Sequence, residues 1–239
     1  MNSATREAYG NTLVELVNNE DIVVLDADLA HATKSLNFQK QCPERFFNMG
    51  IAEADMIGTA AGLSTCGKIP FASTFAVFAA GRAFDQIRNS VCYPNLNVRI
   101  VGTHSGISVG EDGGTHQAIE DIALMRSLPN MTVIHPCDDV EARLAVLASI
   151  DHKGPIYLRL SRVPSPTIHN EDYKFEIGKG EVLKEGNDAA IIATGLMVAK
   201  AIEAGKILEK KGINVKVINM PTIKPLDEEL IIKTAKEKL

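Results

Sequence analysis

The chain has 239 residues, of which 45% are hydrophobic and 23% charged, and its formal net charge is -5 at pH 7. This composition is typical of a globular protein with one or two domains. The sequence contains no run of basic residues, which argues against nucleic acid or an anionic membrane surface as a partner. No apolar stretch reaches the roughly 18 residues of a membrane span, so we expect no membrane association.

The four cysteines are scattered along the chain without a CxxC pair. This spacing indicates neither a zinc site nor a disulfide framework, and we expect this chain to build no metal site of its own. Unpaired cysteines, together with the lack of a secretory leader, favour a reducing, cytoplasmic location.

Helical spacing of apolar residues alternates with short β-branched or apolar runs along the first two thirds of the chain. The spacing predicts helices at 5–19, 52–63, 78–91, 117–128 and 139–149. The runs predict strands at 21–29, 45–50, 68–74, 97–104, 131–136 and 155–161. Strands that alternate with helices predict an α/β fold with a doubly wound, mostly parallel sheet.

In a sheet of this kind, ligands bind beside the carboxyl ends of the strands. This rule places Asp28, Gly50, His104 and Arg162 along one edge of the sheet. We therefore expect the functional site at this edge.

A change in composition after residue 163 predicts a domain boundary. Residues 164–177 are rich in proline and then polar, as in a linker. Beyond them the sequence predicts strands at 188–195 and 214–221 and helices at 196–212 and from 226 onward. Two strands and two helices are too few to bury both faces of a parallel sheet, so we expect only part of a second α/β domain.

A carboxylate and an aromatic pair stand close to two of the predicted strand ends. Glu53 falls in the first turn of the helix at 52–63, where an acid is favoured by about 0.3 to 1 kcal/mol without any further role. Phe75 and Phe78 follow the strand at 68–74, and their spacing is also typical of a core. An aromatic pair beside a carboxylate at this edge nevertheless suits a flat nitrogen heterocycle.

The stretch "GEDGGTHQAIED", from Gly110 to Asp121, concentrates ionisable side chains directly ahead of a predicted helix. A surface turn explains its glycines and threonine, since these residues favour turns and helix caps. A turn makes no use of His116 or of the two acids at 111 and 112. We therefore interpret this stretch as a functional loop.

Three stretches resemble the pyrimidine-binding and early C-terminal domains of transketolases, which use thiamine diphosphate. They are "FFNMGIAEADMIGTAAGL", "STFAVFAAGRAFDQIR" and "GTHSGISVGEDGGTHQAIEDIALMRSLPNMTVIHPCD". The resemblance covers nearly the whole chain. It implies a pyrimidine-binding domain at 1–163, a linker at 164–177 and a partial C-terminal domain at 178–239. It also implies transfer of a two-carbon ketol unit between sugar phosphates.

The resemblance further implies how the cofactor is held. Cofactor contacts are implied for Asp28, Leu29, Ile51, Glu53, Phe75 and Phe78. Glu53 would meet the N1′ nitrogen of the aminopyrimidine and favour its imino tautomer, while Phe75 and Phe78 would pack against that ring. Asp28 is open between a plain acid at a strand end and a role near the cofactor or at a subunit contact.

Substrate contacts are implied by the same resemblance for Arg6, His104, Asp112, His116 and Arg162. Asp112 would bind a substrate hydroxyl, and His116 would touch the oxygens nearest the reacting carbon. Arg6, His104 and Arg162 would hold the sugar phosphate, because a guanidinium group grips phosphate bidentately. The implied catalytic residues are Glu53, His104 and His116.

The chain departs from the family at two points. Ala32 stands where the family usually has a small hydroxyl residue, and Thr33 and Lys34 are candidates to replace that phosphate contact. The chain also lacks the Gly-Asp-Gly followed by Asn that holds the metal and the diphosphate in the family. We therefore expect a separate N-terminal diphosphate-binding subunit, which would supply Mg²⁺ or another divalent metal. An α2β2 assembly with a homodimer contact is expected to follow.

Other functions are open at this stage. A 1-deoxyxylulose-5-phosphate synthase has the same domain order, but it usually has an Asp-Arg pair where this chain has Thr-His-Ser at 103–105. The β subunit of 2-oxo acid dehydrogenases lacks the Gly-Glu-Asp-Gly-x-Thr-His run. A non-catalytic cofactor-binding or scaffold module has no need for Glu53, His104, Asp112 and His116 together. The preferred sugar phosphates and the metal are not set by the sequence.

Overall fold

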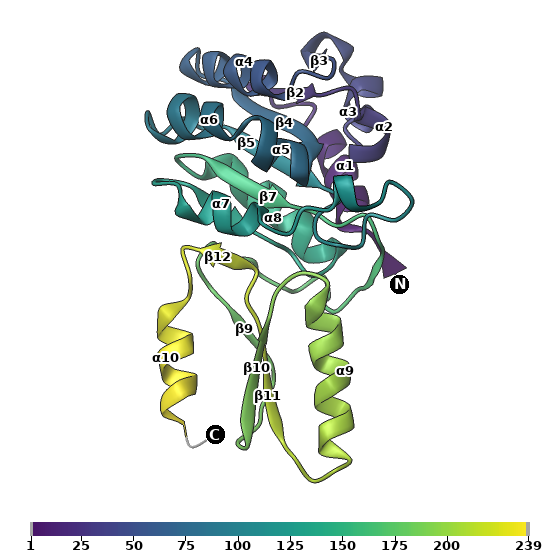
Figure 1. Cartoon of the computed structure of the whole chain (residues 1–239), viewed down its shortest axis with the longest axis vertical. Helices are drawn as coiled ribbons and strands as arrows, with labels where there is room; N and C mark the ends of the chain where they lie inside the picture. The colour runs from purple at the N-terminus through teal and green to yellow at the C-terminus, as the bar shows by residue number, and fades with distance from the viewer. Residues whose placement is uncertain (1, 238–239) are drawn as a thin grey trace.

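The computed structural model describes residues 2–237 as an α/β protein with a large, mostly parallel sheet and a smaller mixed sheet (Figure 1). The predicted fold class is therefore confirmed. No helix within this range is long and apolar enough to cross a membrane.

The first part of the chain alternates strands and helices, as the apolar periodicity predicts. Its strands are β1 (Asn2–Ser3), β2 (Ile22–Asp26), β3 (Phe46–Asn48), β4 (Ile69–Phe75), β5 (Arg99–Thr103), β6 (Thr132–Ile134), β7 (Ile156–Arg159) and β8 (Ser165–Pro166). Its α-helices are α1 (Thr5–Glu15), α2 (Ala30–Thr33), α3 (Leu36–Gln41), α4 (Glu53–Thr65), α5 (Ala76–Arg82), α6 (Phe84–Gln86), α7 (Asp121–Ser127) and α8 (Asp139–Asp151). The helix expected at 78–91 is interrupted at Ala83 and ends in a π-helical turn at Ile87–Cys92.

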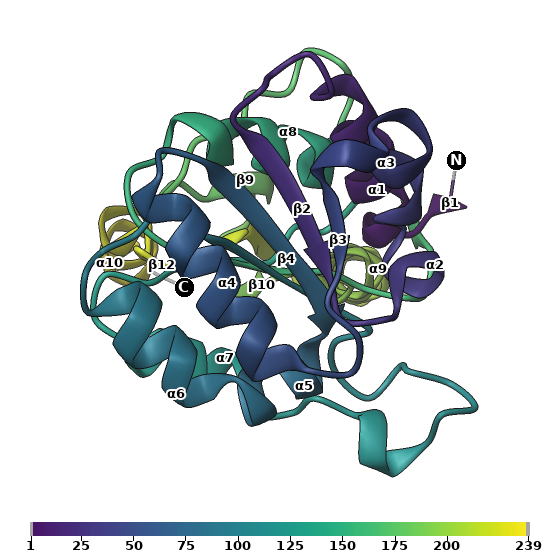
Figure 2. The same ribbon diagram turned by 90° about the horizontal axis from the view of Figure 1, so that it is seen from above.

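The large sheet has the strand order β12-β6-β7-β5-β4-β2-β3, and every pair from β6 to β3 is parallel. Residues of β2, β5 and β7 are buried throughout, because helices cover both faces of the sheet. Side chains from α4, α5 and α7 join the core on one face, and side chains from α1, α3 and α8 join it on the other. Figure 2 shows these two helical layers on opposite sides of the strands.

The second part of the chain contains β9 (Glu181–Lys184), β10 (Ala189–Ala193), α9 (Met197–Glu209), β11 (Val215–Asn219), β12 (Thr222–Lys224) and α10 (Glu228–Lys236). The expectation of two strands here was wrong, because β9 pairs antiparallel with β11 and β12 pairs antiparallel with β6 of the large sheet. The four residues of β9 are all half-buried, so the sequence there lacks the apolar run that marks a buried strand. Figure 1 shows α9 and α10 on either side of the small sheet.

The segment at 164–177, expected to be a linker, is attached to the first domain along part of its length. Ser165 and Pro166 form β8, which pairs antiparallel with β1. His169 is buried, and its ring stacks on Tyr173 with the centroids 3.8 Å apart. This segment therefore packs at the junction of the two parts and is not a free tether.

Candidate active site

The loops at the carboxyl ends of β2, β3, β4, β5 and β7 meet at one edge of the large sheet, because these strands are parallel. Three non-glycine residues there have positive φ angles, 63° at Asp28, 72° at Lys34 and 55° at His104. Such strained backbone is typical of positions where a site fixes the direction of a side chain. The loop between β5 and α7 projects beyond this edge in Figure 2.

A cavity of about 480 Å³ opens at this edge. Its lining includes most of the residues expected to bind cofactor or substrate: Arg6, Leu29, Phe75, Phe78, His104, Asp112, His116 and Arg162. His31, Ala32, Lys34 and Glu111 complete the lining. The structure thus brings together residues from α1, from the loops after β2, β5 and β7, and from the β4–α5 crossover.

Aromatic rings form the wall of this cavity. Phe75 and Phe78 stack with their centroids 5.9 Å apart, and the His104 ring stacks on Phe75 at 3.9 Å. The His116 ring meets the edge of Phe78 at 5.3 Å. Phe75 is buried while Phe78 is only half-buried, so the wall presents apolar surface toward the opening.

His104 is a neutral imidazole with one defined tautomer. Its Nε2 lies 3.1 Å from Nη1 of Arg6, which only donates, so Nε2 accepts. Its Nδ1 then carries the proton and donates to Oγ1 of Thr103 at 3.0 Å. Burial, together with the nearby guanidinium groups of Arg6 and Arg162, lowers the pKa of His104 to about 3. The positive charge at this end of the cavity therefore comes from other residues.

The positive charge is carried by Arg6, Lys34 and Arg162. Besides His104, Arg6 bonds the carbonyl oxygen of Ala32 at 2.8 Å, and its buried Nε has no hydrogen-bond partner within residues 2–237. Lys34 pairs with a carboxylate oxygen of Glu7 at 3.0 Å. Three cations and a neutral imidazole suit an anionic group of a ligand.

Asp26 is a supporting residue that the sequence analysis missed. Its side chain is fully buried; Oδ1 accepts the Leu29 N–H at 2.6 Å, and Oδ2 accepts the hydroxyls of Thr33 and Ser35 at 2.7 and 2.8 Å. Burial raises the pKa of Asp26 to about 6, although these hydrogen bonds oppose the shift. Asp26 holds the loop that carries Leu29 and Lys34, whereas Asp28 is exposed and accepts a hydrogen bond from the Asn48 amide at 2.9 Å.

Glu53 lies at the start of α4, as expected, but outside the lining of the cavity. Its side chain is 3% exposed, and Oε1 accepts a hydrogen bond from Nη1 of Arg82 at 3.0 Å. The Arg82 guanidinium also lies 4.2 Å from the centre of the Phe78 ring, which links Glu53 to the aromatic wall. Oε2 of Glu53 makes no hydrogen bond within the described chain. A buried carboxylate with one free oxygen fits the ring nitrogen of a flat heterocycle.

Ile51 also lies outside the lining of the cavity, in the loop before α4, and its side chain is 75% exposed. The other residues of the described range 2–237 therefore cover little of the apolar surface of Ile51. Its contact with the cofactor stays a prediction.

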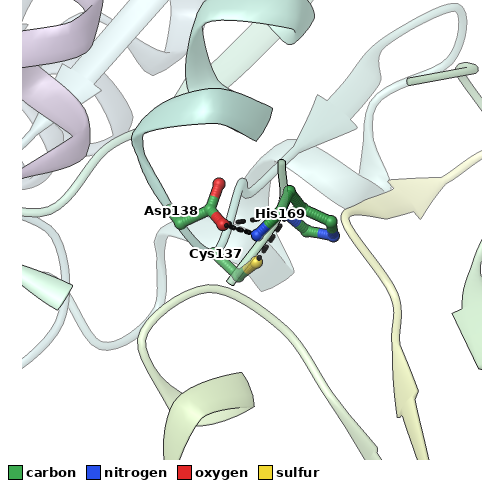
Figure 3. A group of neighbouring side chains, drawn as sticks. All are labelled: Cys137, Asp138 and His169. Atoms are coloured by element: carbon green, nitrogen blue, oxygen red, sulfur yellow. Dashed lines mark hydrogen bonds and ion pairs between the residues drawn. The ribbon is translucent and has the colours of Figure 1, made fainter. Parts of the chain in front are cut away.

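A second group of ionisable side chains, formed by Cys137, Asp138 and His169, has the spacing of metal ligands (Figure 3). Nδ1 of His169 lies 2.9 Å from Oδ2 of Asp138, and Nε2 lies 2.8 Å from Oε2 of Glu181. Carboxylates only accept, so both ring nitrogens carry protons. Burial alone would lower the pKa of His169, but the neighbouring carboxylates raise it to about 9. An imidazolium that bridges the two parts of the chain does not fit a metal ion.

Two family matches cover most of the chain. Residues 2–166 match the family described as "Transketolase, pyrimidine binding domain", and residues 178–238 match "Transketolase, C-terminal domain". The chain is 53% identical, over 96% of its length, to a "Putative transketolase C-terminal section" of Methanocaldococcus jannaschii, of which it covers 73%. It is 45% identical, over 96% of its length, to a 6-deoxy-6-sulfo-D-fructose transketolase subunit of Clostridium sp. (strain MSTE9), of which it covers 72%.

Among solved structures, the chain resembles one described as "Split gene transketolase, inactive beta4 tetramer". The TM-score is 0.91 and the sequence identity 56%, and the match covers 99% of this chain and 77% of the other. This chain therefore belongs to the transketolase family and corresponds, over nearly its whole length, to the C-terminal section of split transketolases.

Proposed function

We propose that this chain is the C-terminal subunit of a thiamine diphosphate-dependent transketolase that moves a two-carbon ketol unit between sugar phosphates. The observation that carries this proposal is the cavity at the strand ends, where Arg6, His104, Asp112, His116 and Arg162 line one space. Cations at one end suit a phosphate, and the carboxylate of Asp112 and the imidazole of His116 suit the hydroxyls of a sugar.

The cofactor site is shared with another subunit in this proposal. When bound, thiamine diphosphate supplies the carbon nucleophile and electron sink that cleave a bond beside a ketone carbonyl. Glu53 would hold or release a proton at its free Oε2, and Phe75 and Phe78 would give apolar packing surface to a flat ring. Asp28, Leu29 and Ile51 stand on the loops around this place. The metal, Mg²⁺ or another divalent ion, and the diphosphate would be held by a separate N-terminal subunit.

The residues of this chain divide the work on the substrate. Arg6 and Arg162 would hold the phosphate, and neutral His104 would keep Arg6 in place through its Nε2. His116, whose Nδ1 lies 3.0 Å from the Thr115 hydroxyl, leaves Nε2 for an oxygen near the reacting carbon. Asp112 is exposed on the same loop and would bind a hydroxyl further along the sugar.

Large apolar side chains around the site support a covering partner. The exposed fraction is 75% for Ile51, 73% for Ile107 and 76% for Ile119, and all three lie in loops at the carboxyl edge of the sheet. Apolar side chains exposed together often mark a surface that a partner covers. We therefore propose an α2β2 assembly with the diphosphate-binding subunit, including a contact between two copies of this chain.

Reconstitution tests the proposal directly. The chain is mixed with candidate diphosphate-binding subunits, thiamine diphosphate and Mg²⁺, and ketol transfer from xylulose 5-phosphate to ribose 5-phosphate is followed, with each subunit alone as a control. We expect activity only in the mixture. A folded complex that transfers no ketol unit from any sugar phosphate would reject the proposed function.

The role of Glu53 is tested in the active mixture. Glu53→Gln should lower kcat at least about 100-fold, because proton transfer by a positioned carboxylate contributes about 10² to 10⁴ in rate. The chain should stay folded, since Arg82 is 53% exposed and remains hydrated when its partner loses its charge. Asp55→Asn is the matched control, because Asp55 is an exposed acid in the same helical turn. Near-normal turnover of Glu53→Gln would remove Glu53 from the cofactor site.

A further inference from the structure

Glu111 has no task in the proposed function, although it lies in the functional loop at 110–121. Its Oε1 accepts a hydrogen bond from Nη2 of Arg162 at 2.9 Å, across the opening of the cavity. Nη1 of Arg162 donates to the carbonyl oxygen of Val109 at 2.7 Å. Both terminal nitrogens of the guanidinium that would hold a phosphate are thus already bonded, one to Glu111 and the other to Val109 just before the loop.

The backbone of the loop is shaped for this contact. Gly110 has a φ of +96°, and a Cβ atom built on it would lie 1.9 Å from Nη1 of Arg162. Any side chain at 110 would therefore push the guanidinium aside in addition to straining the backbone. The glycine lets Arg162 lie directly on the loop, where Nη2 of Arg162 donates to the next residue, Glu111.

Two of the three cations at this end of the cavity form an ion pair with a carboxylate of this chain. Arg162 pairs with Glu111 and Lys34 pairs with Glu7, whereas the acceptors of Arg6 among the described residues are all neutral. The Glu111 side chain is 82% exposed and the Arg162 side chain 27%. Exposed ion pairs are weak, so a carboxylate in this position is easily displaced.

We propose that Glu111 is a placeholder for the anionic group of the substrate, bound to Arg162 until that group displaces it; this inference rests on the proposed function. A phosphate dianion carries more charge than one exposed carboxylate and therefore outcompetes Glu111 at Nη2, while Nη1 keeps its bond to the Val109 carbonyl oxygen. A neutral hydroxyl does not. A free inorganic anion must also displace Glu111, but it lacks the sugar hydroxyls that would contact Asp112 and His116. Glu111 therefore raises the Kd of every anion that binds Arg162, and a sugar phosphate offsets this loss through its hydroxyl contacts, whereas inorganic phosphate does not.

Binding measurements on the full chain test this role without turnover or cofactor. Isothermal titration at fixed ionic strength gives the Kd of ribose 5-phosphate, inorganic phosphate and ribose for the wild type and Glu111→Gln. We expect Glu111→Gln to bind both phosphate ligands about two- to fivefold more tightly, which corresponds to about 0.4 to 1 kcal/mol. The Kd of ribose should not change. The melting temperature of each variant confirms that the fold is kept.

Glu120→Gln is the matched control, because it removes the same charge from an exposed residue of the same loop that makes only a local bond to the Ile119 N–H. Its Kd values should equal those of the wild type. An unchanged Kd for the phosphate ligands in Glu111→Gln, or an equal gain in Glu120→Gln, would overturn the placeholder role. A complex that fails to transfer a ketol unit would instead reject the proposed function, whatever these Kd values are.

Discussion

Replacing His169 with glutamine should remove a pH-dependent part of the stability of this chain. His169 bridges Asp138 of the first domain and Glu181 of the second, and its pKa is raised from 6.5 to about 9. At about 1.36 kcal/mol per pH unit, that difference corresponds to about 3.4 kcal/mol. Glu181 is 40% exposed, so solvent weakens its half of the bridge, and we expect about 1 to 2 kcal/mol.

The direction follows from the raised pKa in the folded state. The stabilisation is complete below pH 6.5, where the unfolded chain also carries a protonated imidazole, and it is lost as the pH rises through about 9. Other titratable groups face the ring from each element packed against it: Cys137, Asp138, Glu141, Tyr173 and Glu181. Their own titrations affect wild type and variant, so the difference between the two isolates His169.

Thermal unfolding between pH 6 and pH 10 measures this difference. About 2 to 4 °C is expected for each kcal/mol in a chain of this size. The melting temperature of His169→Gln should lie below that of the wild type near pH 6, and the gap should close by pH 10. His31→Gln, at an exposed histidine, is the control and should follow the wild type. Parallel curves for the wild type and His169→Gln would refute the imidazolium bridge.

Two further predictions concern the anion end of the cavity. Arg162→Ala should raise KM for phosphorylated donors about tenfold or more and leave KM for unphosphorylated donors nearly unchanged, because a charge-assisted contact contributes about 1.5 to 3 kcal/mol. Steady-state kinetics with a phosphorylated and an unphosphorylated donor measures both KM values. Equal effects on the two donors would show that Arg162 does not bind phosphate. Gly110→Ala should weaken ribose 5-phosphate binding several-fold more than Gly113→Ala. Both positions have positive φ angles, but only the methyl group at 110 moves Arg162 off the Val109 carbonyl that positions it, and this loss exceeds the gain from breaking the weak pair with Glu111. Equal losses in a titration would contradict this account of the loop.

The sheet could be predicted because its strands are runs of buried apolar residues between helices of regular spacing. An apolar run of this length indicates a strand that is buried on both faces, and β2 and β5 are fully buried. The strands β9 and β12 could not be found this way. β9 is half-buried along its length, so its residues do not form an apolar run. β12 is three residues long and pairs with β6, about ninety residues earlier in the chain, and no pattern within residues 222–224 indicates that pairing.

The residues of the site were found by a different route. Their types and spacing within a resemblance to transketolases identified Glu53, His104 and Arg162, and the structure brings His104 and Arg162 into one cavity. The partners of these residues were missed. Arg82 is 29 positions from Glu53 and Glu111 is 51 positions from Arg162, so their pairing depends on how loops from different strands meet. Asp26 was missed because nothing in "LDADL" distinguishes the buried acid from the exposed one.

Strand β12 has a consequence for how this protein can be divided or recombined. Residues 222–224 belong to the second part of the chain but cover the edge of β6, and the His135 N–H donates to the carbonyl oxygen of Pro221 at 2.7 Å. A first domain cut off in the segment at 164–177 would expose that edge, and unpaired strand edges are templates for association with other chains. The two family domains are therefore not exchangeable modules. A chimera that takes its second domain from a relative must also carry a β12 that fits this β6.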